Sequence, residues 1–323
     1  MTQCDVAIIG AGPAGLYAAY YAGFRGFSTT LIDVLPELGG QISAMYPEKN
    51  IYDVAGFPVI KGQHLVDGLV TQAKAFSPSL MLGECVTELE VRDDVVELVT
   101  DKGNHVSAKA CIITGGIGSF TPRELPVGND YVNHGLVYFV PRLEDHRDKD
   151  VVIVGGGDSA FDWAVSLHGI ARSIVIVHRR DTFRAHAATI DQVKALGIEL
   201  ITNSEISAAT GTTHIESVSI TNKEGQTSTR DCQTLVAALG FVANIGPIAN
   251  WGIELEKRHI VVSTSMQTNK PRVFAAGDIA TYPGKVALIS VGFGEAALAV
   301  NNAVPFIAPN QGVFPGHSSG GAE

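Results

Sequence analysis

The chain has 323 residues, which is enough for two compact domains or for one domain with another inserted into it. With 46 % hydrophobic and 17 % charged residues the composition is that of a globular protein, and the net charge of -10 argues against nucleic-acid binding. No apolar run reaches the ~18 residues that span a bilayer, and no basic leader precedes the first expected strand. We therefore expect a cytoplasmic protein that does not contact a membrane.

The four cysteines are spread along the chain. Cys4, Cys85, Cys111 and Cys232 include no Cys-x-x-Cys pair and no spacing typical of zinc ligands. Cys111 lies in the apolar run ACIIT, where a cysteine is most simply a small buried hydrophobic residue. We expect reduced thiols and no metal site.

Strands and helices alternate in two cycles. The first cycle has an apolar strand at residues 5–9, a helical stretch at 16–23 and the strand STTLIDV, which ends near Asp33. The second has the strand in DVVIVGGGDSA, the helical stretch FDWAVSLHGIA and the strand SIVIVH. Such alternation predicts parallel sheets with helices on their faces.

Each cycle is followed by a stretch of alternating hydrophobicity. Residues 84–114 and 216–239 have a period of two with turn residues inside, which predicts antiparallel ribbons and a closing strand. The apolar segment FAAGDIA then supplies another strand, which we expect to return to the first sheet. This order places one domain, residues 117–245, inside another formed by residues 1–116 and 246–323 with a C-terminal tail at 304–323.

The first glycine motif, Gly10-x-Gly12-x-x-Gly15, stands between an expected strand and an expected helix. In a dinucleotide-binding turn the first glycine allows the tight turn, the second lets the backbone approach a pyrophosphate and the third lets helix and strand pack closely. The phosphates then lie at the helix N-terminus. Asp33, at the end of the next strand, is placed to bond ribose hydroxyls.

The second motif is Gly155-x-Gly157-x-x-Ala160. The strand after it ends in His178-Arg179-Arg180, with Arg184 one turn later, and not in an acid. Arginines pair with a phosphate that a carboxylate would repel, so this site is expected to prefer NADP(H). Two such motifs predict an α/β chain with two Rossmann-like three-layer dinucleotide-binding domains, the NADP domain inserted into the other.

Two sites in one chain indicate two different dinucleotides, and FAD is the expected partner of the first. Asp278, in AAGD after an apolar strand, can accept a hydrogen bond from the ribityl chain of a flavin. An alternative role for Asp278 is the N-cap of the next helix, and both roles are compatible.

The order GAGPAG, GGGDSA, HRRDTFR and AAGD resembles that of the low-molecular-weight thioredoxin reductases over nearly the whole chain. That family has a redox Cys-x-x-Cys just before the second glycine motif. Here the corresponding residues are Tyr138-Phe139-Val140-Pro141. A flavin in this chain would therefore pass its electrons directly to an outside acceptor.

One branch of the family lacks the disulfide in the same way, and the chain is similar to it in two further segments. These are MYPEKNIYDVAGFP at residues 45–58 and GFGEAALAVNNA at residues 292–303. The branch consists of the thioredoxin-reductase-like ferredoxin–NADP reductases. The resemblance implies a homodimer that binds FAD and NADP(H), transfers a hydride to flavin N5 and delivers single electrons to ferredoxin.

The resemblance also assigns site residues. Tyr52 matches an aromatic residue that stacks on the isoalloxazine ring, His317 matches an aromatic or histidine that covers the other face from the partner subunit, and Ser319 is a further residue that tunes the flavin. No protein acid or base is assigned. The residues that the resemblance places at FAD are Asp33, Gln41, Tyr46, Val86, Phe120, Asp278 and Ser319.

Simpler interpretations stay open. The simpler interpretation of Tyr52 is an ordinary core or interface tyrosine. The composition of the tail PNQGVFPGHSSGGAE is typical of a flexible end. The glycine motifs do not identify the acceptor, so flavodoxin, a quinone or a low-molecular-weight disulfide are alternatives to ferredoxin. A flavin-bound redox sensor without turnover is a third possibility.

Overall fold

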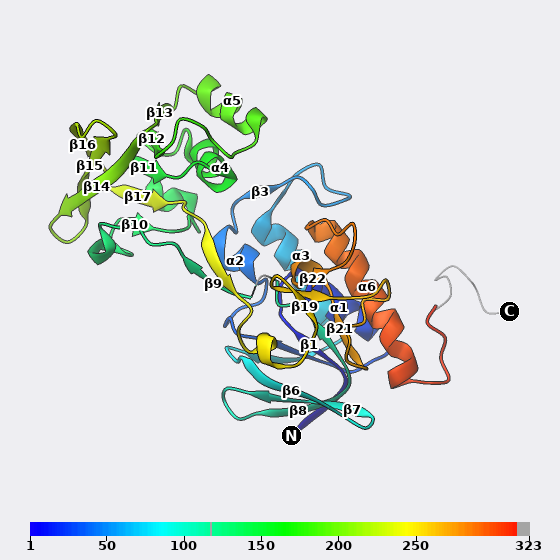
Figure 1. Cartoon of the computed structure of the whole chain (residues 1–323). Helices are drawn as coiled ribbons and strands as arrows, with labels where there is room; N and C mark the ends of the chain where they lie inside the picture. Colours follow the sequence, from blue (N-terminus) through cyan, green and yellow to red (C-terminus); the bar gives the residue numbers. More distant parts are fainter. Residues whose placement is uncertain (117, 315–323) are drawn as a thin grey trace. The chain divides into compact units, whose positions relative to one another are not determined.

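The computed structural model describes residues 1–116 and 118–314, which divide into two compact units (Figure 1). Unit 1 contains residues 1–119 and the chain from 243 onward, and unit 2 contains residues 120–242. The chain leaves unit 1 in β9 (Ser119–Pro122) and returns in β18 (Phe241–Asn244), and these two strands pair with each other. Each unit has its own hydrophobic core.

Unit 1 is built on a seven-stranded sheet within the described residues. Its strands are β5 (Ser79–Leu82), β2 (Thr29–Asp33), β1 (Thr2–Ile9), β8 (His105–Ile113), β7 (Val95–Thr100) and β6 (Val86–Arg92), with β21 (Val273–Ala275) beside the end of β8. The neighbours from β5 to β8, and β21, are parallel, whereas β6 and β7 form an antiparallel ribbon. The expected return of the FAAGDIA strand to the first sheet is confirmed, since Phe274 pairs with Ile112.

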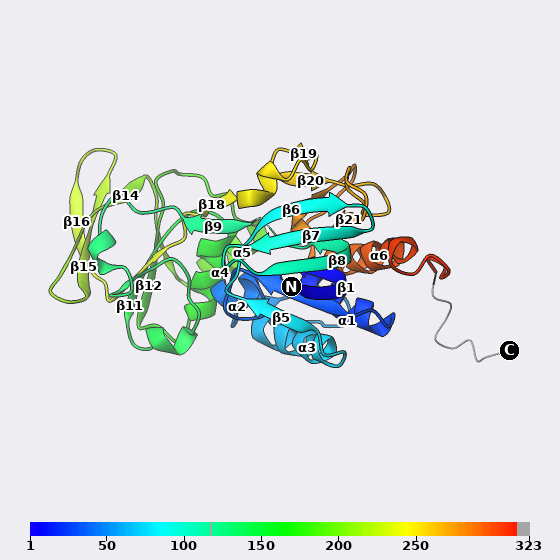
Figure 2. The same cartoon turned by 90° about the horizontal axis from the view of Figure 1, so that it is seen from below.

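Three long helices of unit 1 lie together (Figures 1 and 2). Helix α1 (Pro13–Phe24) packs against both α3 (Gly62–Lys74) and α6 (Ile289–Ile307). The alanines of α1, buried at positions 18, 19 and 22, allow this close approach. Because α6 runs to Ile307, residues 304–307 are helical, and the C-terminal tail begins later than the expected residue 304.

Unit 2 is built on a parallel sheet with the strand order β10, β17, β11, β12, β13. The bounds are β10 (Leu136–Val137), β17 (Thr234–Ala237), β11 (Asp150–Val154), β12 (Ser173–Val177), β13 (Glu199–Ile201), α4 (Asp158–Leu167) and α5 (Ala187–Ala195). Val151–Val154 are all buried, as expected for a strand covered on both faces. An antiparallel ribbon follows, formed by β14 (Ser204–Gly211), β15 (Ile215–Asn222) and β16 (Thr227–Asp231).

Short elements complete both units. They are α2 (Gln41–Met45), β3 (Asn50–Ile51), β4 (Ile60–Lys61), β19 (Leu255–Glu256), β20 (His259–Val261), β22 (Ala280–Thr281) and the 3-10 turns at Asn129–Tyr131, Leu143–His146, Gly246–Asn250 and Gly277–Ile279. The chain thus contains two Rossmann-like α/β units, each with a parallel sheet and an antiparallel ribbon. The predicted fold class is confirmed.

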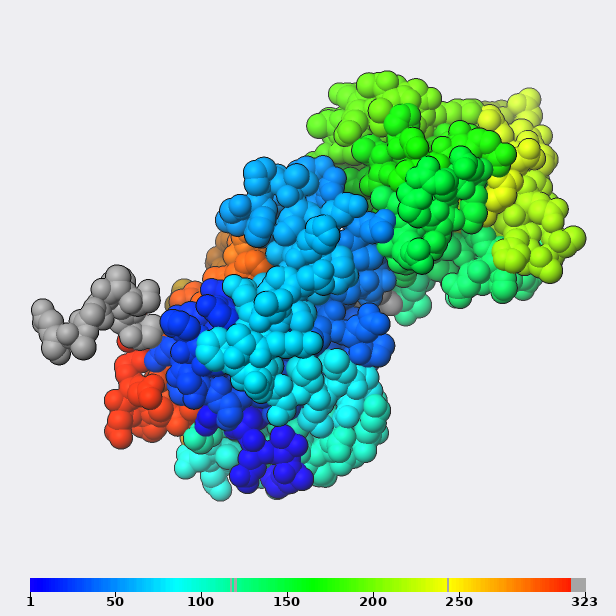
Figure 3. Space-filling view, turned by 180° about the vertical axis from the view of Figure 1, so that it is seen from behind, coloured from blue at the N-terminus to red at the C-terminus, as the bar shows by residue number. Residues whose placement is uncertain are grey.

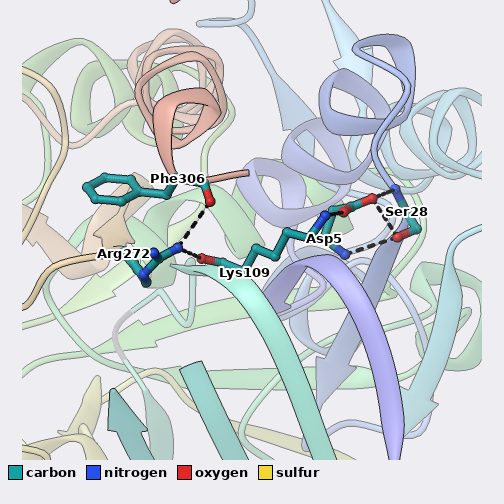
Figure 4. Close-up of polar contacts among 5 residues, drawn as sticks. All are labelled: Asp5, Ser28, Lys109, Arg272 and Phe306. Carbon is teal, nitrogen blue, oxygen red and sulfur yellow. Dashed lines mark hydrogen bonds and ion pairs between the residues drawn. The ribbon is translucent and has the colours of Figure 1, made fainter. Parts of the chain in front are cut away.

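A chain of polar contacts fastens the strands of unit 1 to the end of α6 (Figure 4). Asp5 accepts hydrogen bonds from the backbone N–H and the hydroxyl of Ser28 at 2.9 and 2.8 Å, and from Lys109 Nζ at 2.8 Å. Arg272 Nη1 donates to the Lys109 carbonyl at 3.2 Å and to the Phe306 carbonyl at 3.0 Å. The guanidinium therefore satisfies one of the last carbonyls of α6. Its positive charge also interacts favourably with the negative end of the helix dipole.

Replacing Arg272 by alanine should destabilise unit 1. Its side chain is only 12 % exposed, so two carbonyls would lose a charged donor in a largely dry place. We expect the free energy of unfolding to fall by about 2–3 kcal/mol. Urea denaturation followed by circular dichroism would measure this, with Arg92→Ala as the control because the Arg92–Glu90 pair is exposed. Equal midpoints for the two variants would contradict the anchoring role of Arg272.

Candidate functional site

The turn between β1 and α1 is sterically fixed by its glycines. Gly10 has a φ of +110°, and a Cβ there would lie 2.6 Å from the Thr114 carbonyl oxygen. A Cβ on Gly15 would lie 1.8 Å from the Gly10 carbonyl oxygen and 2.7 Å from the Thr114 hydroxyl. Thr114 itself donates to the Gly10 carbonyl at 2.8 Å. The turn thus packs directly on the end of β8.

Gly12, between these two, faces open space. A Cβ on Gly12 would approach only the Gly40 Cα, at 4.0 Å. Gly12 is the N-cap of α1, and Pro13 follows at the first helical position, where no backbone N–H is needed. The N-terminal end of the helix dipole at an unfilled turn suits a pyrophosphate.

Asp33 lies beside this turn at the end of β2. Its carboxylate is 9 % exposed and accepts hydrogen bonds from the backbone N–H groups of Ala11 and, at 2.7 Å, Leu35. Burial raises the pKa of the Asp33 carboxyl, while the two N–H donors act in the opposite direction. The carboxylate is therefore held rigidly at the strand end, where the sequence predicts a ribose contact.

Segment 39–43 borders the turn on its other side. A Cβ on Gly40 would lie 2.8 Å from the Gly12 Cα, and the Gln41 side chain lies next to Gly116. The Ser43 hydroxyl is buried and makes no hydrogen bond within the described residues. An unsatisfied buried donor on α2, which begins directly after Gly40, fits a cofactor rich in oxygen acceptors. These residues therefore fit FAD.

The AAGD segment is held by a buried carboxylate that sequence reasoning missed. Glu295, 2 % exposed on α6, accepts from the Gly277 N–H at 2.8 Å, from the Tyr282 hydroxyl at 2.6 Å and from Lys285 Nζ. Burial, together with the hydrogen bond to Glu295 and its charge, raises the pKa of Tyr282 to about 12. The network fixes the 3-10 turn that contains Asp278.

Asp278 is exposed on this turn, between buried Gly277 and Ile279. The alternative role of Asp278 as an N-cap is wrong. The 3-10 turn has Ala276 as its N-cap, and the next helix, α6, begins only at Ile289 with Leu288 as its N-cap. The intervening residues form β22 and a turn, so the Asp278 carboxylate is left open to a ligand.

Tyr52 lies on the loop after β3 and is 69 % exposed. With Phe57, Pro58 and Ser290 it lines a cavity of about 560 Å³. The Ser290 hydroxyl donates to the Asp53 carbonyl at 3.0 Å and so fastens the loop to the start of α6. An exposed aromatic ring beside a cavity suits a stacking role better than a core role.

The other residues expected at FAD are distributed as follows. Tyr46 ends α2, and its pKa is raised by burial and by the nearby Asp278 and Asp53 carboxylates. Val86 is buried at the start of β6. The side chain of Phe120, in β9, and the residues His317 and Ser319 lie outside the described part of the structure.

The second glycine turn, in unit 2, repeats the arrangement of the first. A Cβ on Gly155 would lie 2.5 Å from the Ala238 carbonyl oxygen and 3.0 Å from the Ala160 Cβ, whereas a Cβ on Gly157 would meet nothing within 4 Å. Gly157 is the N-cap of α4. As in the first turn, the first glycine packs against the neighbouring strand end, and the middle glycine has free space beside it.

The basic segment after β12 lies next to this turn. The Arg184 N–H donates to the Gly156 carbonyl at 2.7 Å, and the His178 ring lies over Gly156. Burial, together with Arg179, Arg180 and Arg184, lowers the pKa of His178, while the Thr182 carbonyl partly opposes this. The ring is therefore neutral near pH 7, and the arginines carry the positive charge.

The segment where a redox disulfide would lie is filled by apolar packing. Tyr138 packs against the core of unit 2, Val140 is fully buried, and the Phe139 ring stacks on Phe241 with centroids 5.1 Å apart. All four cysteines are free. Burial raises the pKa of the Cys111 thiol, and that of Cys232 to about 12, so neither forms a thiolate near neutral pH.

Two kinds of site are not found in the part of the chain that the structure covers. Residues 1–116 and 118–314 contain no cluster of three or more His, Cys, Asp or Glu side chains that could hold a metal ion. None of the described helices is both long and apolar enough to span a membrane.

The sequence profile described as pyridine nucleotide-disulphide oxidoreductase matches residues 4–302. The chain belongs to this family. It is 57 % identical to the "Ferredoxin--NADP reductase" of Frankia alni over 97 % of this chain and 98 % of that one, and 53 % identical to the same-named protein of Salinispora arenicola over the full length of both. The thioredoxin reductase of Lactococcus lactis shares the fold with a TM-score of 0.78 and 26 % identity, covering 95 % of this chain and 99 % of that one.

Alanine at the glycines of the first turn should separate folding from cofactor binding. Gly12→Ala has room for its methyl group and should fold normally, but the methyl group would fill the space that the pyrophosphate needs. Gly15→Ala collides with backbone and should fail to fold. Circular dichroism and the ratio of absorbance at 450 and 280 nm would measure both effects. Full flavin content in Gly12→Ala would place the pyrophosphate elsewhere.

Replacing Glu295 by glutamine should destabilise the AAGD turn. The charge of Lys285 would be left without its partner in a buried place, where breaking an ion pair costs about 3–5 kcal/mol. We expect a lower melting temperature and weaker FAD retention, measured by circular dichroism and by flavin release on dialysis. Glu90→Gln, at an exposed pair, should change neither. Normal stability of Glu295→Gln would show that the network is dispensable.

Proposed function

We propose that the protein is an FAD-dependent ferredoxin–NADP reductase, with FAD in unit 1 and NADP(H) in unit 2. The observation that carries the proposal is the combination of two dinucleotide turns with a packed apolar segment at residues 138–141. Curated proteins that are 57 % and 53 % identical over nearly the whole chain bear this name, which supports the assignment.

In unit 1, the open face at Gly12 and the N-terminus of α1 would hold the pyrophosphate of FAD, and Asp33 its ribose. Asp278 would hold the ribityl chain, with Gln41, Tyr46, Val86 and Ser319 as further contacts. Phe120, in β9 where the chain leaves unit 1, is a further proposed contact. FAD held there would supply a ring that can accept a hydride and release single electrons. Tyr52 and His317 would flank its ring and keep water and oxygen from it.

In unit 2, the open face at Gly157 and the N-terminus of α4 would hold the pyrophosphate of NADP(H). Arg179, Arg180 and Arg184 would hold the 2′-phosphate. None of the three has an ion-pair partner among residues 1–116 and 118–314. Free guanidinium groups at this position favour NADPH over NADH.

The acceptor is proposed to be external because this chain offers no internal one. Tyr138 and Pro141 stand where a Cys-x-x-Cys would have its cysteines, and the buried thiols of Cys111 and Cys232 stay protonated. No cysteine takes part in the proposed reaction.

The proposal includes a cytoplasmic homodimer. Free thiols are typical of a reducing compartment. Unit 1 leaves the large apolar side chains Phe24, Phe76 and Leu80 exposed, and a second subunit is one way to cover such area. Sedimentation equilibrium at micromolar concentration would test the dimer.

The deciding experiment compares acceptors with NADPH as the donor. We expect reduction of ferredoxin to exceed that of thioredoxin, flavodoxin, a quinone and glutathione disulfide at equal concentration. Stopped-flow mixing with NADPH without oxygen should bleach the flavin absorbance. Activity with a disulfide but not with ferredoxin would refute the proposal, and a flavin that stays oxidised would indicate a sensor.

A cysteine-free variant is the matched control. With Ala at positions 111 and 232 and Ser at positions 4 and 85, the protein should reduce ferredoxin at its normal rate, because no thiol relays electrons. A rate at least tenfold lower in a folded, FAD-loaded variant would reveal a thiol step.

A further inference from the structure

The basic segment of unit 2 borders a cavity whose lining extends beyond its arginines. A cavity of about 480 Å³ lies beside the basic segment, and residues from three separate parts of the chain line it. These residues are Arg179, Arg180, Asn203, Glu205, Thr221, Asn222 and Lys223. The ribbon β14–β16, which supplies most of them, lies at the surface of unit 2 (yellow-green in Figure 3).

Backbone hydrogen bonds bring the three parts together. The Asn203 N–H donates to the Arg180 carbonyl at 3.3 Å, and the Lys223 N–H donates to the Asn203 carbonyl at 3.1 Å. The Ser204 N–H also donates to the His178 carbonyl at 3.1 Å. The turn that contains Lys223 is therefore hydrogen-bonded, through Asn203, to the segment that contains Arg179 and Arg180.

The cavity is cationic, and its cations are free. Arg179, Arg180 and Lys223 face one acid, Glu205, and none of these three cations has an ion-pair partner within the described chain. Two other arginines of unit 2 are paired, Arg172 with Asp150 at 3.0 Å and Arg230 with Glu199 at 2.6 Å. Free cations gathered around one cavity favour an anion from solution.

Asn203 adds a requirement that an anion alone does not meet. Its side-chain oxygen is buried and has no hydrogen-bond partner in the described structure. A buried acceptor needs a donor, and a doubly ionised phosphate has none. A phosphorylated nucleoside offers both groups, because its sugar hydroxyl and its base amine can donate.

We propose that Lys223 and Asn203 are specificity residues for the 2′-phosphoadenosine end of NADP(H). The inference rests on the proposed binding of NADP(H) by unit 2. Lys223 contacts the 2′-phosphate together with Arg179 and Arg180, and the Asn203 side-chain oxygen accepts a hydrogen bond from the adenosine. Lys223 therefore distinguishes NADPH from NADH, whereas Asn203 contributes to both.

The test for Lys223 is the binding of 2′,5′-ADP and 5′-AMP by isothermal calorimetry to the full-length holoprotein. Lys223→Gln should weaken 2′,5′-ADP roughly tenfold, as expected for a lost charged contact, and 5′-AMP less than twofold. Lys194→Gln makes the same charge change on α5 of the same unit and should alter neither. Unchanged 2′,5′-ADP affinity in Lys223→Gln, or an equal loss for both nucleotides, would overturn the role of Lys223.

The test for Asn203 uses glycine, because its φ of +53° lies in the region that glycine adopts without strain. Asn203→Gly should weaken 2′,5′-ADP and 5′-AMP by the same factor, roughly threefold to tenfold. Normal affinity for both would remove Asn203 from the site, and a loss confined to 2′,5′-ADP would contradict its assignment to the adenosine.

These measurements are independent of the acceptor. If ferredoxin were not reduced, the proposed function would fail while the nucleotide affinities would still report on the cavity. Lys223 is exposed on a hairpin turn, so its glutamine variant should fold, and thermal melting would verify this. A second variant, Lys223→Glu, should weaken 2′,5′-ADP more than Lys223→Gln does, and the opposite order would also overturn the proposal.

Discussion

One steric constraint shapes both units: the backbone that leaves the first strand must touch the end of the neighbouring strand. At Gly10 the neighbour is Thr114, and at Gly155 it is Ala238. No side-chain carbon fits at either contact. The middle glycines, Gly12 and Gly157, are not required by this packing, and the space above them is left for a ligand. Folding and binding thus depend on different glycines of the same short motif.

The parts of the site that lie within one strand, turn and helix could be predicted from the sequence. Glycine spacing, Asp33 at a strand end and the arginines after β12 are local patterns whose meaning depends on few neighbours. Residues that act across the fold could not. Thr114 and Glu295 touch their turns from strands and helices distant in the chain, and only the hydrogen bonds of the fold show it.

The alternative role of Asp278 as a helix cap is wrong for a related physical reason. An N-cap residue must directly precede the first residue of its helix. The sequence does not reveal that a strand and a turn lie between Asp278 and the start of α6 at Ile289. The turn is instead stabilised from below by Glu295, whose carboxylate takes three donors. A short polar residue after an apolar strand is therefore ambiguous until the helix that follows is located.

The packing at residues 138–141 has a consequence for how such chains diverge. A Cys-x-x-Cys at positions 138 and 141 would take the Tyr138 ring out of contact with the core of unit 2. Restoring a dithiol is thus not a matter of two isolated codon changes, because the cavity left by a lost aromatic ring must be filled as well. A chain that packs Tyr138 against its core would therefore regain a dithiol only with a loss of folding stability.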